Sequence, residues 1–375
     1  MASQSPLTMK FEVPTPPAEV VSKISEKEIT EKYINSSGIK QENSSLPYMD
    51  PALVDFQLLL HSDEELQKFG SLINSWGCFQ LVNHGITSSK LDQVIQVCKD
   101  FFALPVEEKQ KYIQVLGRLE GWGGDTMSKD QNLNWNNRFL LFIYPVEQRN
   151  PKFWPDESLS KFREIVEDYA AELRKIFEVV CKAISKLLNL EEDNLLNKYA
   201  RDGIMGFRVN NYPSCPFPDK VVGLKAHSDV HILTFLLQDK EVEGLHVEKD
   251  GQWYKEPIVP GALVIKLLIC WRLGLQGFIC ELFSKRRRTT KILTNGKVKS
   301  VYHRAVVDGT RERISLACGF GPPQNTKIGP LNELITEETP KLYKTDSNYV
   351  MTAVSNYALG NRTIDTMKIH RSSNI

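Results

Sequence analysis

The chain has 375 residues, of which 41% are apolar and 25% charged, and its formal net charge is +1. This length allows one large domain or two domains with a substantial core, and the balanced charge gives no indication of a nucleic-acid or membrane partner. The seven cysteines form no Cys-x-x-Cys pair and the N-terminus lacks the apolar stretch of a signal peptide, so we expect a reducing, cytoplasmic location.

The N-terminal part of the chain is predicted to be mostly helical. Residues 1–45, with a Pro-rich stretch, are typical of an arm that packs on the body. Asp63-Glu64-Glu65 opens a helix that runs to about Ser75, and residues 78–82 are typical of a buried strand. A second helical face ends before Pro105 and is formed by Leu91, Val94, Ile95, Cys98, Phe101 and Phe102.

A long amphipathic helix follows, because apolar residues keep the 3.6-residue step from Phe162 to Leu187. From Gly206 onward the apolar period changes to two, which predicts short strands separated by turns. The strands are expected at residues 207–212, 222–226, 232–238, 244–248, 252–255, 262–265, 300–306 and 314–318. Lys249-Asp250-Gly251 indicates a hairpin between two of them. Such spacing favours a sandwich, jelly roll or barrel with helices packed outside.

Polar residues in these strands carry the candidate chemistry. His227 and Asp229 are two residues apart, so on a strand they would point to one side, and His303 lies in a later strand-like run. Two imidazoles and one carboxylate can occupy one face of a non-haem Fe(II) ion. Arg313 and Ser315 form another such pair, which can hold a carboxylate. Taken singly, each pair is more common as surface or capping residues than as a site, and His303 alone is consistent with a solvated or core histidine.

The joint pattern resembles the plant Fe(II)- and 2-oxoglutarate-dependent dioxygenases, especially their flavonoid- and alkaloid-modifying branch. The segment around Asn210-Asn211-Tyr212-Pro213 precedes the metal and carboxylate pairs, as in that family. Further matching segments are Trp76-Gly-Cys-Phe-Gln-Leu-Val-Asn-His-Gly85, Phe102-Ala-Leu-Pro105, Glu120-Gly-Trp-Gly123, Leu236-Leu-Gln238 and Ile328-Gly-Pro-Leu331. The likeness covers nearly the whole chain except residues 266–291.

The resemblance implies an α+β fold, with a double-stranded β-helix (jelly roll) core, a helical N-terminal region and a long supporting helix. The expected regions are an arm at 1–45, a helix and strand region at 46–155, the long helix at 156–200, the catalytic jelly roll at 201–325 and a C-terminal segment at 326–375.

By the same resemblance His227, Asp229 and His303 are the iron ligands. Arg313, Ser315, Tyr212 and Asn210 are the contacts of 2-oxoglutarate. The expected cofactors are Fe(II), 2-oxoglutarate as cosubstrate, O2, and ascorbate as reductant. The expected reaction releases succinate and CO2 while a small substrate is hydroxylated, desaturated or O-demethylated.

The substrate is expected to be a small aromatic plant metabolite, flavonoid-like or alkaloid-like, bound by a monomer. The resemblance suggests pocket residues at Phe139, Phe142, Met205, His231 and Phe320. Gly319 departs from the family, which often has a Phe there, and Phe320 is a possible substitute.

The segment 266–291 departs from the family, which has a short strand and turn of the form Asn-x-Gly-Asp in its place. As a result Asp229 and His303 are 74 positions apart, where the family has about fifty. The segment is either a retained intron or a tolerated loop. Its charges Lys266, Arg272 and Glu281 make membrane insertion unfavourable, at about 2.5–3.5 kcal/mol each near a helix centre.

Two alternatives to the oxygenase follow from this departure and from the shared fold. In one, the segment displaces His303 and leaves a catalytically impaired binding protein. In the other, the protein is an oxidase that does not consume 2-oxoglutarate. The sequence also predicts that the chain as written is poorly soluble and weakly active.

Overall fold

The computed structural model of the protein describes residues 33–34, 45–115, 119–125, 132–155, 159–197, 203–267, 301–323, 326–337, 339–359 and 363–369. Of the predicted arm, only residues 33, 34 and 45 are among them, and of the segment 266–291 only Lys266 and Leu267. The predictions made for the rest of the arm and the segment lie outside the described residues.

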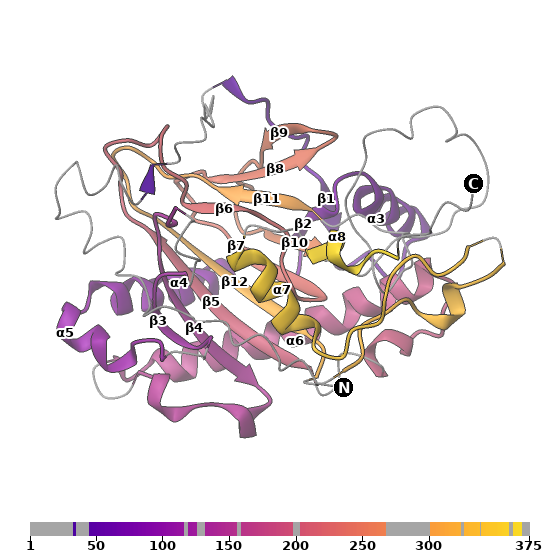
Figure 1. Ribbon diagram of the computed structural model, residues 1–375, viewed down its shortest axis with the longest axis horizontal. Helices are drawn as coiled ribbons and strands as arrows, with labels where there is room; N and C mark the ends of the chain where they lie inside the picture. The colour runs from indigo at the N-terminus through magenta and orange to yellow at the C-terminus, as the bar shows by residue number, and fades with distance from the viewer. Residues whose placement is uncertain are drawn as a thin grey trace, which may run out of the picture.

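Two β-sheets facing each other form the centre of the described fold (Figure 1). The larger sheet has the strand order β1-β2-β10-β7-β12-β5-β4-β3, and the smaller one has the order β6-β11-β8-β9. Neighbouring strands are antiparallel, except for the parallel pair β1 and β2. Two facing antiparallel sheets with helices outside are the jelly-roll arrangement that the sequence predicts.

The strands of the larger sheet are β1 (Leu53–Asp55), β2 (Cys78–Val82), β3 (Gly121–Gly123), β4 (Asn137–Tyr144), β5 (Ile204–Tyr212), β7 (Leu233–Leu237), β10 (Leu263–Leu267) and β12 (Arg313–Gly321). Those of the smaller sheet are β6 (Leu224–His227), β8 (Leu245–Lys249), β9 (Gln252–Lys255) and β11 (Tyr302–Ala305). The helices are α3 (Asp63–Ser75), α4 (Ser88–Ala103), α5 (Val106–Lys109), α6 (Phe162–Leu187), α7 (Tyr349–Ala358) and α8 (Thr363–Met367).

Helices α3, α4 and α6 cover the outer face of the larger sheet (Figure 1). The side chains of Ser62 and Thr87 accept hydrogen bonds from the first turns of α3 and α4, and so satisfy backbone N–H groups that have no partner within the helix. The apolar stripe of α6 is buried along its whole length, which explains the sustained helical period in the sequence. No helix among the described residues has both the length and the apolar character needed to cross a bilayer.

Most predicted elements are confirmed, and the hairpin is confirmed in detail. Helices are found at Asp63–Ser75 and Phe162–Leu187, and a strand at Cys78–Val82. Asp250 and Gly251 join β8 to β9 with φ values of 55° and 87°, the left-handed conformations that a two-residue hairpin turn needs. The sequence analysis did not predict β4, which begins with the buried polar residues Asn137 and Arg138.

Strand β12 separates the interior of the jelly roll from the helical layer. Its residues alternate in direction, as in any strand. Arg313 points toward the smaller sheet, where its side chain passes over Gly244 beside β8. Phe320 points the other way and stacks on Phe177 of α6, with ring centroids 4.2 Å apart. The space between the two sheets therefore receives Arg313, Ser315 and Gly319 from this strand.

Candidate active site

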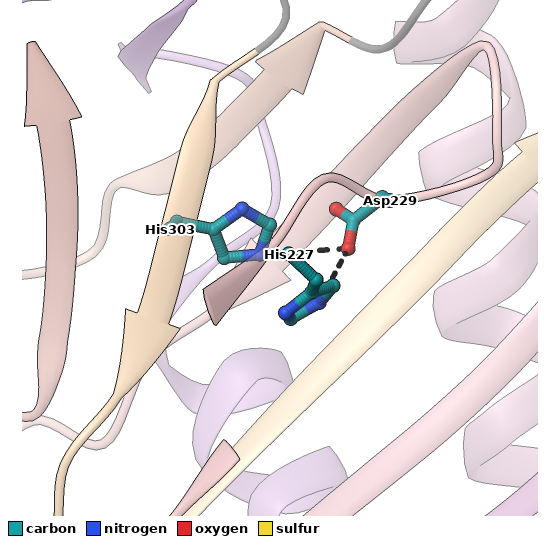
Figure 2. A group of neighbouring side chains, drawn as sticks. All are labelled: His227, Asp229 and His303. Atoms are coloured by element: carbon teal, nitrogen blue, oxygen red, sulfur yellow. Dashed lines mark ion pairs between the residues drawn. The ribbon is translucent and has the colours of Figure 1, made fainter. Parts of the chain in front are cut away.

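Three potential metal ligands meet between the sheets, as Figure 2 shows. His227 ends β6, Asp229 lies just beyond that strand, and His303 lies on β11. One ligand atom from each lies within 4.8 Å of the others. Strand β11 pairs with β6 so that His303 is directly opposite His227, and their ring centroids are 4.3 Å apart.

The prediction that His227 and Asp229 share one face of a strand is wrong in its local geometry. The strand ends at His227, and Asp229 belongs to the loop that leads into β7. From this loop, Oδ1 of Asp229 lies 3.2 Å from Nε2 of His227. The two side chains therefore converge, but Asp229 reaches the site from a loop and not from the strand.

Backbone carbonyl groups orient both imidazole rings. Nδ1 of His227 lies 2.7 Å from the carbonyl oxygen of Lys225, and Nδ1 of His303 lies 3.4 Å from that of Val301. A carbonyl oxygen only accepts a hydrogen bond, so in each ring Nδ1 is the donor and Nε2 keeps its lone pair. Both Nε2 atoms face Oδ1 of Asp229, at 3.2 and 3.5 Å.

This donor set fits a divalent metal ion. Metal-binding histidines usually donate the other ring N–H to a carbonyl or carboxylate, which fixes the ring as it is fixed here. Two imidazole nitrogens and one carboxylate, with the remaining positions open, are the ligands of non-haem Fe(II). Nitrogen and oxygen acceptors that face one another need a cation between them, and the arrangement provides the place for one.

Lys266 contributes a cation to the same cluster. Its ammonium lies 2.8 Å from Oδ2 of Asp229 and 2.7 Å from Nε2 of His303. Burial raises the pKa of Asp229, the Lys266 ammonium lowers it, and that pKa lies well below its usual range. Burial and the Lys266 ammonium lower the pKa of His303 to about 4, so this imidazole is neutral at pH 7.

The four residues expected to contact 2-oxoglutarate form a second cluster between the sheets. Strands β12 and β5 pair so that Arg313 is opposite Tyr212 and Ser315 is opposite Asn210. Arg313 is 2% exposed, and its Nε donates a hydrogen bond to the carbonyl oxygen of Val242 at 3.1 Å. The guanidinium of Arg313 lies over the ring of Tyr212, 5.3 Å from the ring centroid. Burial lowers the pKa of Arg313.

Two glycines leave room for this second cluster. A Cβ atom on Gly244 would lie 2.8 Å from Cδ and Nε of Arg313, and one on Gly223 would lie 2.9 Å from the ring of Tyr212. Both distances are shorter than real Cβ atoms show, so a larger residue at either position would push the functional side chain aside.

A network of charged side chains that was not predicted from the sequence holds the side chain of Asn210. Nε of Arg208 donates to Oδ1 of Asn210 at 2.7 Å, and NH2 of Arg208 contacts both carboxylate oxygens of Asp125 at 2.9 and 3.1 Å. Burial raises the pKa of Asp125, but Arg208 and Arg138 outweigh it and lower that pKa to about 2. Asp125 lies in an ordinary-looking polar stretch, so no local signal marked it.

Lys266 was also missed, although the sequence contains one signal for it. It is the single charged residue in the strand Leu263–Leu267, whose residues are all buried. From the sequence alone, Lys266 counted as a charge against membrane insertion and as the first residue of the segment 266–291.

The suggested substrate residues divide between the two faces of the larger sheet. Phe142 lies on the interior side, because a Cβ on Gly206 would contact its ring at 3.9 Å. His231 is also interior and lies against Gly319. The other three face the helical layer, so the prediction that they line a pocket at the metal cluster is not supported. Phe139 stacks on Phe101 of α4, and Met205 and Phe320 line a cavity of about 350 Å³ beside α6.

Comparisons with known proteins agree with this geometry. Residues 51–157 match the N-terminal model of the non-haem dioxygenases of morphine synthesis, and residues 195–322 match the 2OG-Fe(II) oxygenase superfamily. Codeine O-demethylase of Papaver somniferum is 36% identical over 338 residues, which is 88% of each chain. A flavonoid 7-O-demethylase of Ocimum basilicum is 32% identical over 98% of this chain and 94% of its own length.

A solved structure gives the same assignment. The crystal structure of JOX2 in complex with 2OG, Fe and JA superposes with a TM-score of 0.81 at 25% identity, covering 96% of this chain and 99% of JOX2. The cofactors are therefore Fe(II) and 2-oxoglutarate, and the substrate is a small molecule. The chain belongs to the 2OG-Fe(II) oxygenase superfamily and is a plant-type dioxygenase within it.

Proposed function

We propose that His227, Asp229 and His303 hold the Fe(II) of this oxygenase. The observation that carries the proposal is the orientation of the two imidazoles, whose Nδ1 atoms face backbone carbonyls while both Nε2 atoms face Asp229. Bound iron would supply the redox chemistry, in which O2 converts 2-oxoglutarate to succinate and CO2 and oxidises the substrate.

Arg313, Ser315, Tyr212 and Asn210 are proposed to bind 2-oxoglutarate. Arg313 is buried and its guanidinium offers several donors in one plane, which suits a carboxylate. The hydroxyl groups of Ser315 on β12 and Tyr212 on β5 lie on the same face of the sheet as Arg313 and can add donors. The Asp125 and Arg208 pair fixes Asn210 on β5. These side chains orient the cosubstrate and exclude water from it.

The substrate is proposed to be a small aromatic metabolite that is hydroxylated, desaturated or O-demethylated. The similarity to codeine O-demethylase and to a flavonoid 7-O-demethylase supports removal of an O-methyl group as the first reaction to test. Phe142 and His231 are the suggested residues on the interior side of the sheet, and they are proposed to contact the substrate. Ascorbate is proposed as the reductant.

The impaired-enzyme alternative requires that His303 be displaced by the segment 266–291. In the structure His303 is opposite His227 in the strand pairing and lies within reach of Asp229. This geometry and the enzymatic relatives favour the oxygenase over a binding protein. A monomeric, cytoplasmic enzyme is proposed, and the five described cysteines, which are free and buried, support a reducing location.

The test is turnover of a panel of O-methylated flavonoids and alkaloids with Fe(II), 2-oxoglutarate, O2 and ascorbate. We expect succinate release with each true substrate and formaldehyde in equal amount for O-demethylation. His227→Ala and Asp229→Ala should abolish succinate release and retain the circular dichroism of the native fold. His61→Ala, a change at an exposed histidine, is the matched control and should keep full activity. O2 uptake without succinate would favour the 2-oxoglutarate-independent oxidase instead.

A further inference from the structure

Lys266 reaches the proposed metal site from the opposite sheet. It lies on β10, between β2 and β7, while all three proposed ligands belong to the smaller sheet or to the loop after β6. Its side chain is 4% exposed, so the ammonium is shielded from water and is held by the cluster itself.

The ammonium occupies the lone pairs that a metal would use. Nε2 of a neutral imidazole has a single lone pair, and the one on His303 accepts a hydrogen bond from Nζ of Lys266 at 2.7 Å. Oδ2 of Asp229 forms an ion pair with the same nitrogen at 2.8 Å. An ammonium has three N–H donors, and these two acceptors satisfy two of them. A metal bound to His303 and the ammonium in this position exclude each other.

Charge acts in the same direction. The ammonium neutralises the buried carboxylate of Asp229, which would otherwise be a costly isolated charge. A divalent ion beside a buried ammonium would be repelled strongly, because such pairs are poorly screened by solvent. Lys266 therefore stabilises the metal-free protein and opposes metal entry.

The fold offers the ammonium a second position. Thr234 is opposite Lys266 in the pairing of β7 and β10, so the two side chains lie on the same face. Oγ1 of Thr234 is buried and has no hydrogen-bond partner among the described residues. The ammonium of Lys266, on its flexible four-carbon stem, can move to this acceptor when a metal binds.

We propose that Lys266 is a built-in competitor of Fe(II): it holds Asp229 and His303 in the metal-free protein and must leave them before iron binds. This inference rests on the proposed metal ligands. It assigns the control of metal affinity to Lys266, the first residue of the segment 266–291, separately from the residues that follow it.

The test is metal binding without turnover. Native protein, Lys266→Met and Lys266→Asn are titrated without oxygen with Mn(II) or Co(II), and with Fe(II), by calorimetry. Both variants should bind at least about tenfold more tightly than the native chain, the order of effect that neighbours of metal ligands usually have. The Met variant keeps the apolar stem of lysine. The Asn variant keeps a group that can donate to Asp229, and it replaces the Met variant in the test if that variant does not fold.

Lys240→Met is the matched control, because it removes the same charge away from the proposed metal ligands. The ammonium of Lys240 is exposed and lies 3.0 Å from Oδ1 of Asp92 on α4. Its removal should change metal affinity less than about twofold, so that an equal gain in Lys240→Met would overturn direct competition in favour of a general charge effect.

Thermal melting gives a second readout. Without metal, Lys266→Met should melt at a lower temperature than the native protein, because Asp229 loses its counter-charge. Saturating Mn(II) should raise its melting temperature by more than it raises that of the native protein. Equal affinities and equal shifts in folded native and variant proteins would overturn the role of Lys266. If neither native protein nor variants bound any of the three metals, the proposed metal site itself would be wrong.

Discussion

The imidazole of His231 occupies the space over Gly319 that a side chain would otherwise fill. A Cβ atom on Gly319 would lie 2.2 Å from Nδ1 of His231. That Nδ1 atom is buried and has no hydrogen-bond partner among the described residues, and burial lowers the pKa of the ring. The two positions therefore form one feature, in which the imidazole on the loop fills the space that a side chain at position 319 would need.

This relationship predicts strong coupling between the two positions. Gly319→Phe should destabilise the protein by about 1–3 kcal/mol through overpacking, and His231→Ala in the same chain should recover most of that loss. Urea unfolding of both single variants and the double variant measures the coupling. Strictly additive changes in the free energy of unfolding would show that the two side chains do not compete for one space.

The cosubstrate cluster predicts that Arg313→Lys weakens 2-oxoglutarate binding selectively. Lysine offers a point charge in place of a planar set of donors, and it would lose the hydrogen bond to Val242 and the guanidinium contact with the ring of Tyr212. The apparent KM for 2-oxoglutarate should rise about tenfold, or by about 1.4 kcal/mol, with less than a twofold change for the organic substrate. Equal changes for both would place the carboxylate elsewhere.

Gly244→Ala tests the same cluster without replacing a functional side chain. The new methyl group would meet Arg313 at 2.8 Å and the carbonyl oxygen of Val306 at 3.0 Å, so we expect a higher KM for 2-oxoglutarate and unchanged Mn(II) affinity. Gly206→Ala is the matched control, since its nearest contact would be an ordinary 3.7 Å from Leu140. A normal KM in Gly244→Ala would mean that Arg313 has another rotamer available for the cosubstrate.

Glu256 predicts how stability depends on pH. Its side chain is buried, with Oε1 accepting a hydrogen bond from Gln80 at 2.9 Å, and burial raises its pKa to about 8. The folded chain therefore retains a proton that the unfolded chain loses near pH 4.5, so stability falls as pH rises from about 5 to about 8. The native protein should lose on the order of 4 kcal/mol of unfolding free energy over this range, and Glu256→Gln should not show this loss. Denaturant unfolding at several pH values checks this, and parallel pH profiles for the two proteins would contradict it.

The sequence predicted well those features that repeat locally. The period of α6 and the hairpin at Asp250 and Gly251 depend on neighbouring residues, and both are found where expected. The three proposed metal ligands were found from their residue types and their family-like spacing. Their actual convergence depends on the loop at Asp229 and on the pairing of β11 with β6, which no local pattern encodes.

The features missed by sequence are contacts between distant segments. Lys266 lies in an apolar strand, and its role becomes visible only when β10 is placed opposite the loop that carries Asp229. Phe320 follows Gly319 in sequence, but strand alternation sends it to the helical layer. Strand β4 begins with polar residues that are buried by long-range partners such as Gln114 and Asn211, so its sequence does not look like a strand.

The strand order of the larger sheet has a consequence for how the chain reaches its native state. Strands β1 and β2 form one edge and β3 and β4 the other, so the four strands that come first in the sequence flank the four that follow. Gln80 on β2 pairs with Val264 on β10, and such distant pairings slow folding because long loops must close before any contact forms. A fragment beginning after α6 would expose both edges of the sheet formed by β5, β7, β10 and β12, and it would be prone to aggregate through these edges. Strands β1 to β4, which carry none of the proposed metal ligands, are thus required for the half of the chain that carries those ligands to exist as a folded unit.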